Sequence, residues 1–253
     1  MIWFQTALLS SSGGRDHNED CCGYHMTETA GCWVLADGLG GHRGGATASR
    51  LAVEAALVGP VHDQSEKLVD ELAGRANRAI LARQEGEPEL ASMRTTFTAL
   101  AVSQTSAAWT HCGDSRVYWF RAGRLCAQTR DHSVPGRLAA AGIIALDQIR
   151  QHEDRARLLR SLGSKSETAA DSASMEDQPR PGDTFLLASD GFWEWVNEPE
   201  MEQDLTACRT PGLWLDHLED RLRARATPGH DNYSAIAVFA TNGDGHSTPS
   251  IVV

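Results

Sequence analysis

Short apolar runs separated by polar turns recur along the whole chain. Runs of about four to eight apolar residues bounded by turn residues are typical of strands. Strands are predicted at 3–9, 32–36, 184–188 and 234–240. The last of these alternates poorly between apolar and polar residues, which predicts burial on both of its faces.

The middle of the chain holds several apolar runs in close succession. Connections of only two or three residues join antiparallel neighbours, so these runs predict a β meander. Its strands are expected at 96–103, 106–112, 115–120 and 124–128. A further short strand is expected near 170–176.

Helices are indicated where apolar residues recur every three or four positions. Residues 43–58 place Ala48, Leu51, Ala52 and Ala55 on one face. The same spacing predicts helices at 65–84 and 211–226, and Trp193 and Trp195 are expected to begin a short helix and to pack in the core. Helices collected in pairs beside antiparallel strands indicate the α+β class, with two sheets packed face to face and helices outside.

One domain over residues 1–240 accounts for the length of the chain, which is 253 residues. Residues 129–165 have a different character, with a short Ala-rich helix and a basic stretch, and are interpreted as an insertion over a sheet edge. Residues 241–253 are rich in Gly, Ser, Thr and Asn and are expected to form a flexible tail.

Charge and cysteine content narrow the class of function. Lys and Arg number 23 against 34 Asp and Glu, which gives a net charge of −11 and excludes the basic surface of a nucleic-acid binder. The six cysteines show no CxxC spacing, and the first residues lack the features of a signal peptide. No run approaches the roughly 18 apolar residues of a membrane span. A cytoplasmic protein with reduced thiols and no membrane role is therefore expected.

Carboxylates stand where the predicted strands end. The apolar run before Asp37 stops at Asp-Gly followed by further glycines, and the same pattern recurs at Asp190. Asp-Gly after a strand is often only a turn. Acids in similar positions elsewhere are Glu19, Asp114 and Asp231. Carboxylates gathered at one point would repel one another without cations, and all-oxygen ligands suit Mg²⁺ or Mn²⁺.

Arg15 lies four residues before Glu19 in the same polar loop. A guanidinium group there could hold an oxyanion through two hydrogen bonds. Metal ions beside such a clamp are typical of sites that hydrolyse phosphoesters, where a bound water attacks phosphorus.

Several short motifs, in this order and spacing, resemble those of the metal-dependent protein serine/threonine phosphatases of type 2C. They are Arg15-Asp-His-Asn-Glu-Asp20, Ala36-Asp-Gly-Leu-Gly-Gly-His42, Thr95-Thr96, Gly113-Asp-Ser-Arg116, Thr129-Arg-Asp-His-Ser133, Leu162-Gly163, Ala188-Ser-Asp-Gly191 and Asp231-Asn232. The resemblance runs from about residue 5 to 240. It implies a four-layer α-β-β-α sandwich of two antiparallel sheets, with metals in a cleft at one edge of the sheets.

The resemblance also implies a role for each candidate residue. Asp37 would bridge two Mn²⁺ or Mg²⁺ ions, and the carbonyl group of Gly38 would join the site. Asp190 and Asp231 would complete the first metal, and Glu19 would hold the second through water. By the same resemblance, Arg15 would bind the phosphate.

Further expectations concern the third metal and the residues around the site. Asp114, with Asp190, would bind a third and weaker ion, although Gly113-Asp114 also fits a hairpin turn. Residues 133–165 resemble a mobile flap. Asp20 and Asn232 would orient ligand loops.

Two positions depart from the family pattern. Many eukaryotic members carry His after Asp-Gly as a proposed general acid, whereas this chain has Leu39, so the leaving-group proton would come from bound water or from His42. Arg94 stands where Gly usually precedes the Thr-Thr pair.

The resulting hypothesis is hydrolysis of phosphoserine and phosphothreonine in proteins by a monomer that opposes a serine/threonine kinase. A second hypothesis keeps the metals but assigns a small-molecule phosphate as substrate. A third is an inactive regulatory binding module, which should have lost a metal carboxylate, yet Asp37, Asp190 and Asp231 are all present.

Overall fold

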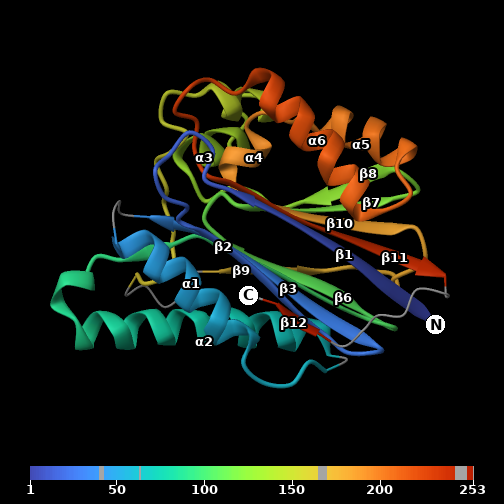
Figure 1. Cartoon of the computed structure of the whole chain (residues 1–253), viewed down its shortest axis with the longest axis horizontal. Helices are drawn as coiled ribbons and strands as arrows, with labels where there is room; N and C mark the ends of the chain where they lie inside the picture. Colours follow the sequence, from blue (N-terminus) through green and yellow to red (C-terminus); the bar gives the residue numbers. More distant parts are fainter. Residues whose placement is uncertain (40–42, 63, 165–169, 243–249, 253) are drawn as a thin grey trace.

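Two antiparallel sheets pack face to face, and helices cover the outer face of each (Figure 1). The computed structural model of the chain describes residues 1–39, 43–62, 64–164, 170–242 and 250–252. Within these residues the first sheet has the strand order β1-β11-β10-β7-β8. The second has the order β12-β2-β3-β5-β6-β9, with β4 paired to β3. The α+β sandwich expected from the sequence is confirmed.

The strands and helices have the following bounds. The strands are β1 (Ile2–Ser11), β2 (Asp20–Met26), β3 (Ala30–Leu39), β4 (Arg94–Thr95), β5 (Phe97–Ser103), β6 (Ala107–Cys112), β7 (Arg116–Arg121), β8 (Arg124–Gln128), β9 (Asp171–Ser174), β10 (Asp183–Ala188), β11 (Tyr233–Asn242) and β12 (Ser250–Val252). The helices are α1 (Arg43–Leu57), α2 (Ser65–Gly86), α3 (Val134–Ala140), α4 (Asp190–Trp193), α5 (Glu198–Ala207) and α6 (Pro211–Arg225), with short 3₁₀ turns η1 (Pro88–Leu90) and η2 (Leu146–Gln151).

The central strands are buried on both faces, which explains their unbroken apolar sequences. In β3, Trp33 and Leu35 pack between the two sheets. The alternate residues Cys32, Val34 and Ala36 face α1 and α2. In β10, Leu187 points into the same inter-sheet core, and Leu186 faces the helices of the other layer. An acid at the end of such a strand is therefore held at the edge of a rigid core.

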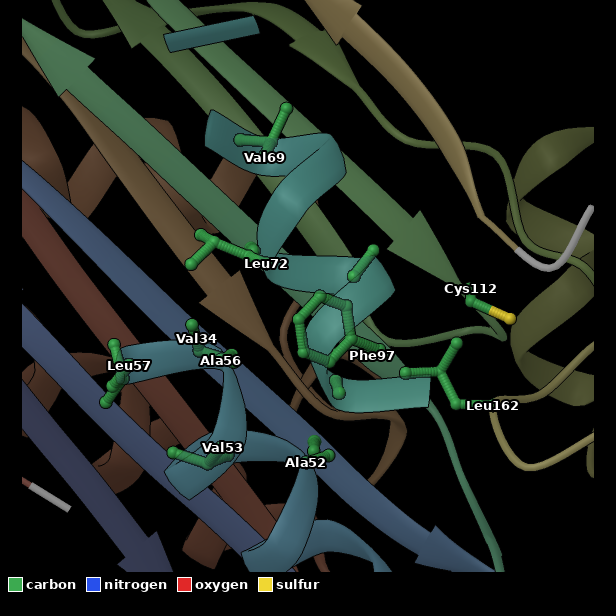
Figure 2. Close-up of a cluster of buried hydrophobic side chains, with 14 of the residues drawn as sticks. Val34, Ala52, Val53, Ala56, Leu57, Val69, Leu72, Phe97, Cys112 and Leu162 are labelled. Atoms are coloured by element: carbon green, nitrogen blue, oxygen red, sulfur yellow. The ribbon is translucent and has the colours of Figure 1, made fainter. Parts of the chain in front are cut away.

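The core between α1, α2 and the second sheet also receives the end of the 133–164 segment. Figure 2 shows Leu162 beside Phe97 and Cys112 in this cluster, and Leu162 is 1% exposed. Its backbone forms an isolated β-bridge with Thr95. The segment thus begins beside one sheet and ends anchored against the other.

The predicted meander is wrong at one connection. β5 and β6 are antiparallel neighbours, as are β7 and β8, but β6 and β7 belong to different sheets. Sheets in a sandwich are only about 10 Å apart, so a three-residue link can cross between them as easily as it can form a hairpin. Gly113 has φ 104°, which directs the chain across.

Other expectations were incomplete. β2 and α5 were not predicted, and α4 begins at Asp190 and ends at Trp193 instead of beginning there. Of the expected tail, residues 243–249 and 253 lie outside the described residues, while 241–242 continue β11 and 250–252 pair with β2. The flexibility of the tail stays a prediction.

Candidate metal and phosphate site

Acidic residues from both sheets meet at one end of the sandwich. β3 carries Asp37 near its end, and Asp20 begins β2 directly opposite, because the two residues are paired across the strands. In the other sheet, Asp190 follows the end of β10. Asp231 lies in the loop just before β11. The pKa of the Asp37 carboxyl is raised by burial first and then by the nearby charges of Asp20, Asp190, Asp114 and Asp231.

The backbone of Asp37 is fixed by two threonines on the neighbouring chain segment. Its N–H donates to Thr96 Oγ1 at 2.9 Å, and its carbonyl accepts from Thr96 N at 2.8 Å and from Thr95 Oγ1 at 2.8 Å. Thr96 Oγ1 is in turn 2.7 Å from Ser115 Oγ. The threonine pair therefore holds the strand end that presents the carboxylate.

Gly38 stands where no side chain fits. A Cβ atom there would lie 2.2 Å from the carbonyl oxygen of Gly45 on α1. The N–H of Gly38 donates to the carbonyl of Glu19 at 3.1 Å, and Ser49 Oγ donates to the same carbonyl at 2.5 Å. A Cβ at Gly45 would reach Glu19 Oε2 at 2.8 Å, so Glu19 lies against the first turn of α1. His42 lies outside the described residues.

A serine pair and an asparagine join the two sheets. Ser189 Oγ donates to Asp20 Oδ2 at 2.9 Å and accepts from the N–H of Ser234 at 2.9 Å. The side chain of Asn232 accepts from the N–H of Glu19 at 2.8 Å. Its amide nitrogen donates to the carbonyls of Ser12 and His17, at 2.9 and 2.8 Å. These bonds fix the loop that carries Arg15 and Glu19.

Arg15 lies at the outer rim of this acidic cluster. Its Nη2 is 3.1 Å from Asp231 Oδ2, and the two side chains are 55% and 49% exposed. A cavity of about 690 Å³ opens here, lined by Arg15, Asp190 and Asp231 together with Arg155 and Glu194. A phosphate group entering this cavity would meet a guanidinium and several carboxylates at once.

The inner carboxylates, defined as Asp20, Asp37, Asp114 and Asp190, resist ionisation. Burial raises the pKa of Asp190 to about 7, and the carboxylates of Glu194 and Asp231 add to the effect. Burial also raises the pKa of Asp20 to about 6. For Asp37 and Asp114 the pKa lies well above its ordinary value, again through burial first and neighbouring acids second. A bound cation would favour the ionised carboxylates and so offset both effects.

Asp114 reaches the cluster from the crossing between the two sheets. It is 4% exposed, and its carbonyl accepts a hydrogen bond from Trp193 Nε1 at 2.9 Å. After burial, the nearby charge of Asp190 is the largest influence on its pKa. Asp114 and Asp190 are therefore neighbours, although one precedes β7 and the other begins α4.

Comparison with known proteins decides the family. Residues 12–232 match the family described as protein phosphatase 2C. The chain belongs to the protein phosphatase 2C family. A relative from Listeria monocytogenes, the serine/threonine phosphatase stp, is 31% identical over 234 residues, which cover 88% of this chain and 90% of stp.

Solved structures of phosphatase 2C proteins have the same fold. The crystal structure of the Mycobacterium tuberculosis serine/threonine phosphatase PstP is 28% identical, with a TM-score of 0.79, and the match covers 96% of this chain and 100% of that one. The catalytic domain of PstP in complex with two manganese ions is also 28% identical, with a TM-score of 0.77 over 96% and 100% of the two chains. The expectation of a type 2C serine/threonine protein phosphatase is confirmed.

The described carboxylates suit a hard divalent cation by their chemistry, since they offer oxygen ligands alone. Within the described ranges, no three Asp, Glu, His or Cys side chains converge as a complete ligand set. The individual metal-binding roles stay predictions for this phosphatase 2C protein.

Several supporting residues had no role in the prediction. Thr95, Thr96 and Ser189 belong to the family motifs, but the sequence assigned them no function. In the structure the two threonines bond to the backbone of Asp37. Ser189 bonds to the carboxylate of Asp20. Trp193 was expected only to pack in the core, yet it bonds to Asp114. Such contacts join segments far apart in the sequence, so no local pattern reveals them. The structure shows no helix among the described residues that could cross a membrane.

Proposed function

We propose that this chain hydrolyses phosphoserine and phosphothreonine in proteins, using two Mn²⁺ or Mg²⁺ ions and, more weakly, a third. The observation that carries the proposal is the meeting of acids from two separate sheets beside Arg15 at the mouth of one cavity. Membership of the phosphatase 2C family supports it.

The positions of the carboxylates support the division of ligands. Asp37, which is coupled to each of the other inner acids and to Asp231, is proposed to bridge the two ions, with the carbonyl group of Gly38 beside it. Asp190 and Asp231 would complete the first ion, and Glu19 would hold the second through water. Asp114 would take the third ion together with its neighbour Asp190.

The bound ions would supply a nucleophilic water at neutral pH and offset the charge of the phosphoryl group. Arg15 would hold phosphate oxygens by exchanging its bond with Asp231 for bonds to the substrate, an exchange made easy by the exposure of both side chains. The bonds of Ser189 to Asp20 and of Asn232 to Glu19 would keep these acids oriented. The aliphatic Leu39 cannot donate a proton, so the leaving oxygen would receive its proton from water.

We further propose that the protein acts as a cytoplasmic monomer that opposes a serine/threonine kinase. All six cysteines are free, and burial raises the pKa of Cys32 and Cys112 to about 12, which keeps these thiols protonated. Unreactive buried thiols fit a reducing compartment. Size-exclusion chromatography with light scattering would test the monomer.

The decisive assay measures phosphate release from a phosphothreonine peptide and from p-nitrophenyl phosphate, with Mn²⁺, with Mg²⁺ and with EDTA. We expect release to require a metal and kcat/KM to favour the peptide. A higher kcat/KM for the small ester would favour the small-molecule hypothesis. No release from either compound with either metal would contradict a catalytic function.

A further inference from the structure

Trp193 connects the acidic cluster with residues that belong to a different part of the chain. It ends α4, is 2% exposed, and its indole Nε1 donates to the carbonyl of Asp114 at 2.9 Å. Asp114 is part of the link between β6 and β7, where no strand pairing holds the backbone. The indole N–H therefore holds Asp114 at a point where the sheets do not.

Two arginines lie over the indole ring of Trp193. The Cζ atom of Arg116 is 3.5 Å from the ring centroid, and that of Arg150 is 5.4 Å away. Arg116 is 3% exposed and forms two hydrogen bonds of 2.8 Å to the carboxylate of Asp131. Glu198 Oε1 lies 2.7 Å from Arg150 Nη2 and 3.6 Å from Arg116 Nη1. Stacked and paired guanidinium groups of this kind hold an aromatic ring in one orientation.

Arg150 comes from the 133–164 segment and is its main polar contact with Trp193. It lies in η2, and its Nη1 donates to the carbonyl of Trp193. The residue before it, Ile149, is 4% exposed and packs in the same cluster as Trp193. By contrast, Ile143 and Leu146 of the same segment are 68% and 62% exposed. Ile149 and Arg150 thus dock the segment on the layer that contains α4.

We propose that Trp193 is a positioning residue that couples the docking of the 133–164 segment, through Arg150, to the position of Asp114. The proposal rests on the assignment of Asp114 to a metal in the proposed function. When Arg150 moves away from Trp193, the indole ring loses one of its two cationic partners. The backbone carbonyl of Trp193 also loses the hydrogen bond from Arg150. The bond from the indole to Asp114 weakens, and Asp114 binds its ion less well.

Coupling of this kind acts in both directions. If docking of the segment improves the affinity of Asp114 for a metal, then metal binding must favour the docked segment by the same factor. The metal content of the site and the exposure of residues 150–160 should therefore change together. This reciprocity provides a measurement that does not depend on catalysis.

The test compares Trp193→Phe with Trp214→Phe. Trp214 is a matched control because it is fully buried in the same cluster and its Nε1 also donates to a backbone carbonyl, that of Met201, at 3.1 Å. The first readout is Mn²⁺ affinity by calorimetry. The second is the rate at which trypsin cuts after the exposed Arg155 and Arg157, with and without Mn²⁺.

We expect Trp193→Phe to raise the dissociation constant of the weakest Mn²⁺ site about fivefold, as for loss of one hydrogen bond. It should also speed tryptic cleavage and abolish the protection that Mn²⁺ gives. Trp214→Phe should change neither readout. Equal effects of the two variants, or no effect of Trp193→Phe, would overturn the proposal.

Arg150→Gln tests the same coupling by changing the residue of the 133–164 segment that contacts Trp193. It replaces Trp193→Phe in the experiment if that variant does not fold. It should weaken the same Mn²⁺ site, although Arg150 bonds to Trp193 and Glu198 and not to Asp114. In the double variant the two effects should be less than additive. Full additivity, or an unchanged Mn²⁺ affinity in Arg150→Gln, would contradict the coupling. A wild-type chain that releases no phosphate would instead contradict the proposed function.

Discussion

The inner carboxylates and the rim of the cavity differ in how firmly they are held. Asp20 and Asp37 are paired across strands, and Asp190 begins a helix one residue after a buried strand. At the rim, Arg15 and Asp231 are about half exposed and form an ion pair, and Asp231 Oδ1 also accepts from the N–H of Asn232 at 2.9 Å. A rigid set of acids with raised pKa values suits a resident cation, whereas an exposed ion pair suits a partner that enters and leaves.

Carboxylates therefore serve different functions in the interior of the site and at its rim. Burial makes an uncompensated carboxylate costly, so the inner acids need either a bound proton or a cation. Exposed ion pairs contribute little to stability, so breaking the rim pair to bind phosphate costs little. The contrast can be tested residue by residue, starting where the expected effect is largest.

Asp37→Asn should have the largest effect. The substitution removes the charge that is coupled to every other inner acid. We expect kcat to fall by roughly a thousandfold or more, since both proposed ions lose a ligand. The exposed Asp216→Asn on α6 is the matched control and should leave kcat unchanged. A variant at position 37 with near-normal kcat would refute the bridging role.

Arg15→Ala should have an intermediate effect, mainly on KM. The side chain is exposed and touches no inner carboxylate by an ion pair, so folding and Mn²⁺ affinity should stay close to those of the wild type. We expect kcat/KM for a phosphothreonine peptide to fall by about tenfold to a hundredfold, as for loss of a charged hydrogen bond. Arg50→Ala on α1 is the control. Loss of Mn²⁺ binding in Arg15→Ala would contradict the proposal that Arg15 binds phosphate while the inner carboxylates bind the metal.

The stability of the metal-free chain should depend on pH. Asp20 and Asp190 have a pKa of about 6 and about 7 in the folded chain, against 3.8 ordinarily. Between these values the folded state binds more protons than the unfolded state, so stability falls as pH rises from about 4 to about 7. We expect Tm with EDTA to drop by several degrees between about pH 5 and pH 8, and Mn²⁺ to raise Tm more at pH 8. A constant Tm in EDTA across this range would contradict the raised pKa values of Asp20 and Asp190.

Leu39→His should have the smallest effect. Leu39 follows Gly38 at the end of β3, and no proton transfer is assigned to it. A true general acid contributes about a hundredfold or more, so we expect kcat to change by less than about threefold and the pH profile to keep its shape. A large rise in kcat, with a new ionisation in the pH dependence of kcat, would contradict this expectation. It would show that proton donation to the leaving group limits the rate of the native chain.

The sequence predicts the strand ends well because each ends a continuous apolar run. Asp37 follows such a run directly and Asp190 follows one after Ser189, and the structure places both at the same end of the sandwich. The depth of the acids was not predictable. The partial burial of Asp20, for example, depends on pairing with β3 and on a bond from Ser189.

The missed elements had weaker local signals. β2 begins Asp-Cys-Cys-Gly and contains no β-branched residue, so its pairing with β3 decides its structure. α5 has a poor apolar face, yet its capping box of Asn197 and Glu200 could have indicated its start. The β6–β7 crossing and the bond of Trp193 to Asp114 join distant segments, and no residue spacing encodes them.

The central claim is that acids from the two sheets together hold the metal that hydrolysis needs. The most direct measurement is Mn²⁺ titration of phosphate release from a phosphothreonine peptide by the wild type and Asp190→Asn, side by side. We expect the wild type to be inactive in EDTA and saturable by Mn²⁺, and the variant to stay at least about a hundredfold slower at every Mn²⁺ concentration. An Asp190→Asn variant with wild-type activity and Mn²⁺ dependence would contradict the claim.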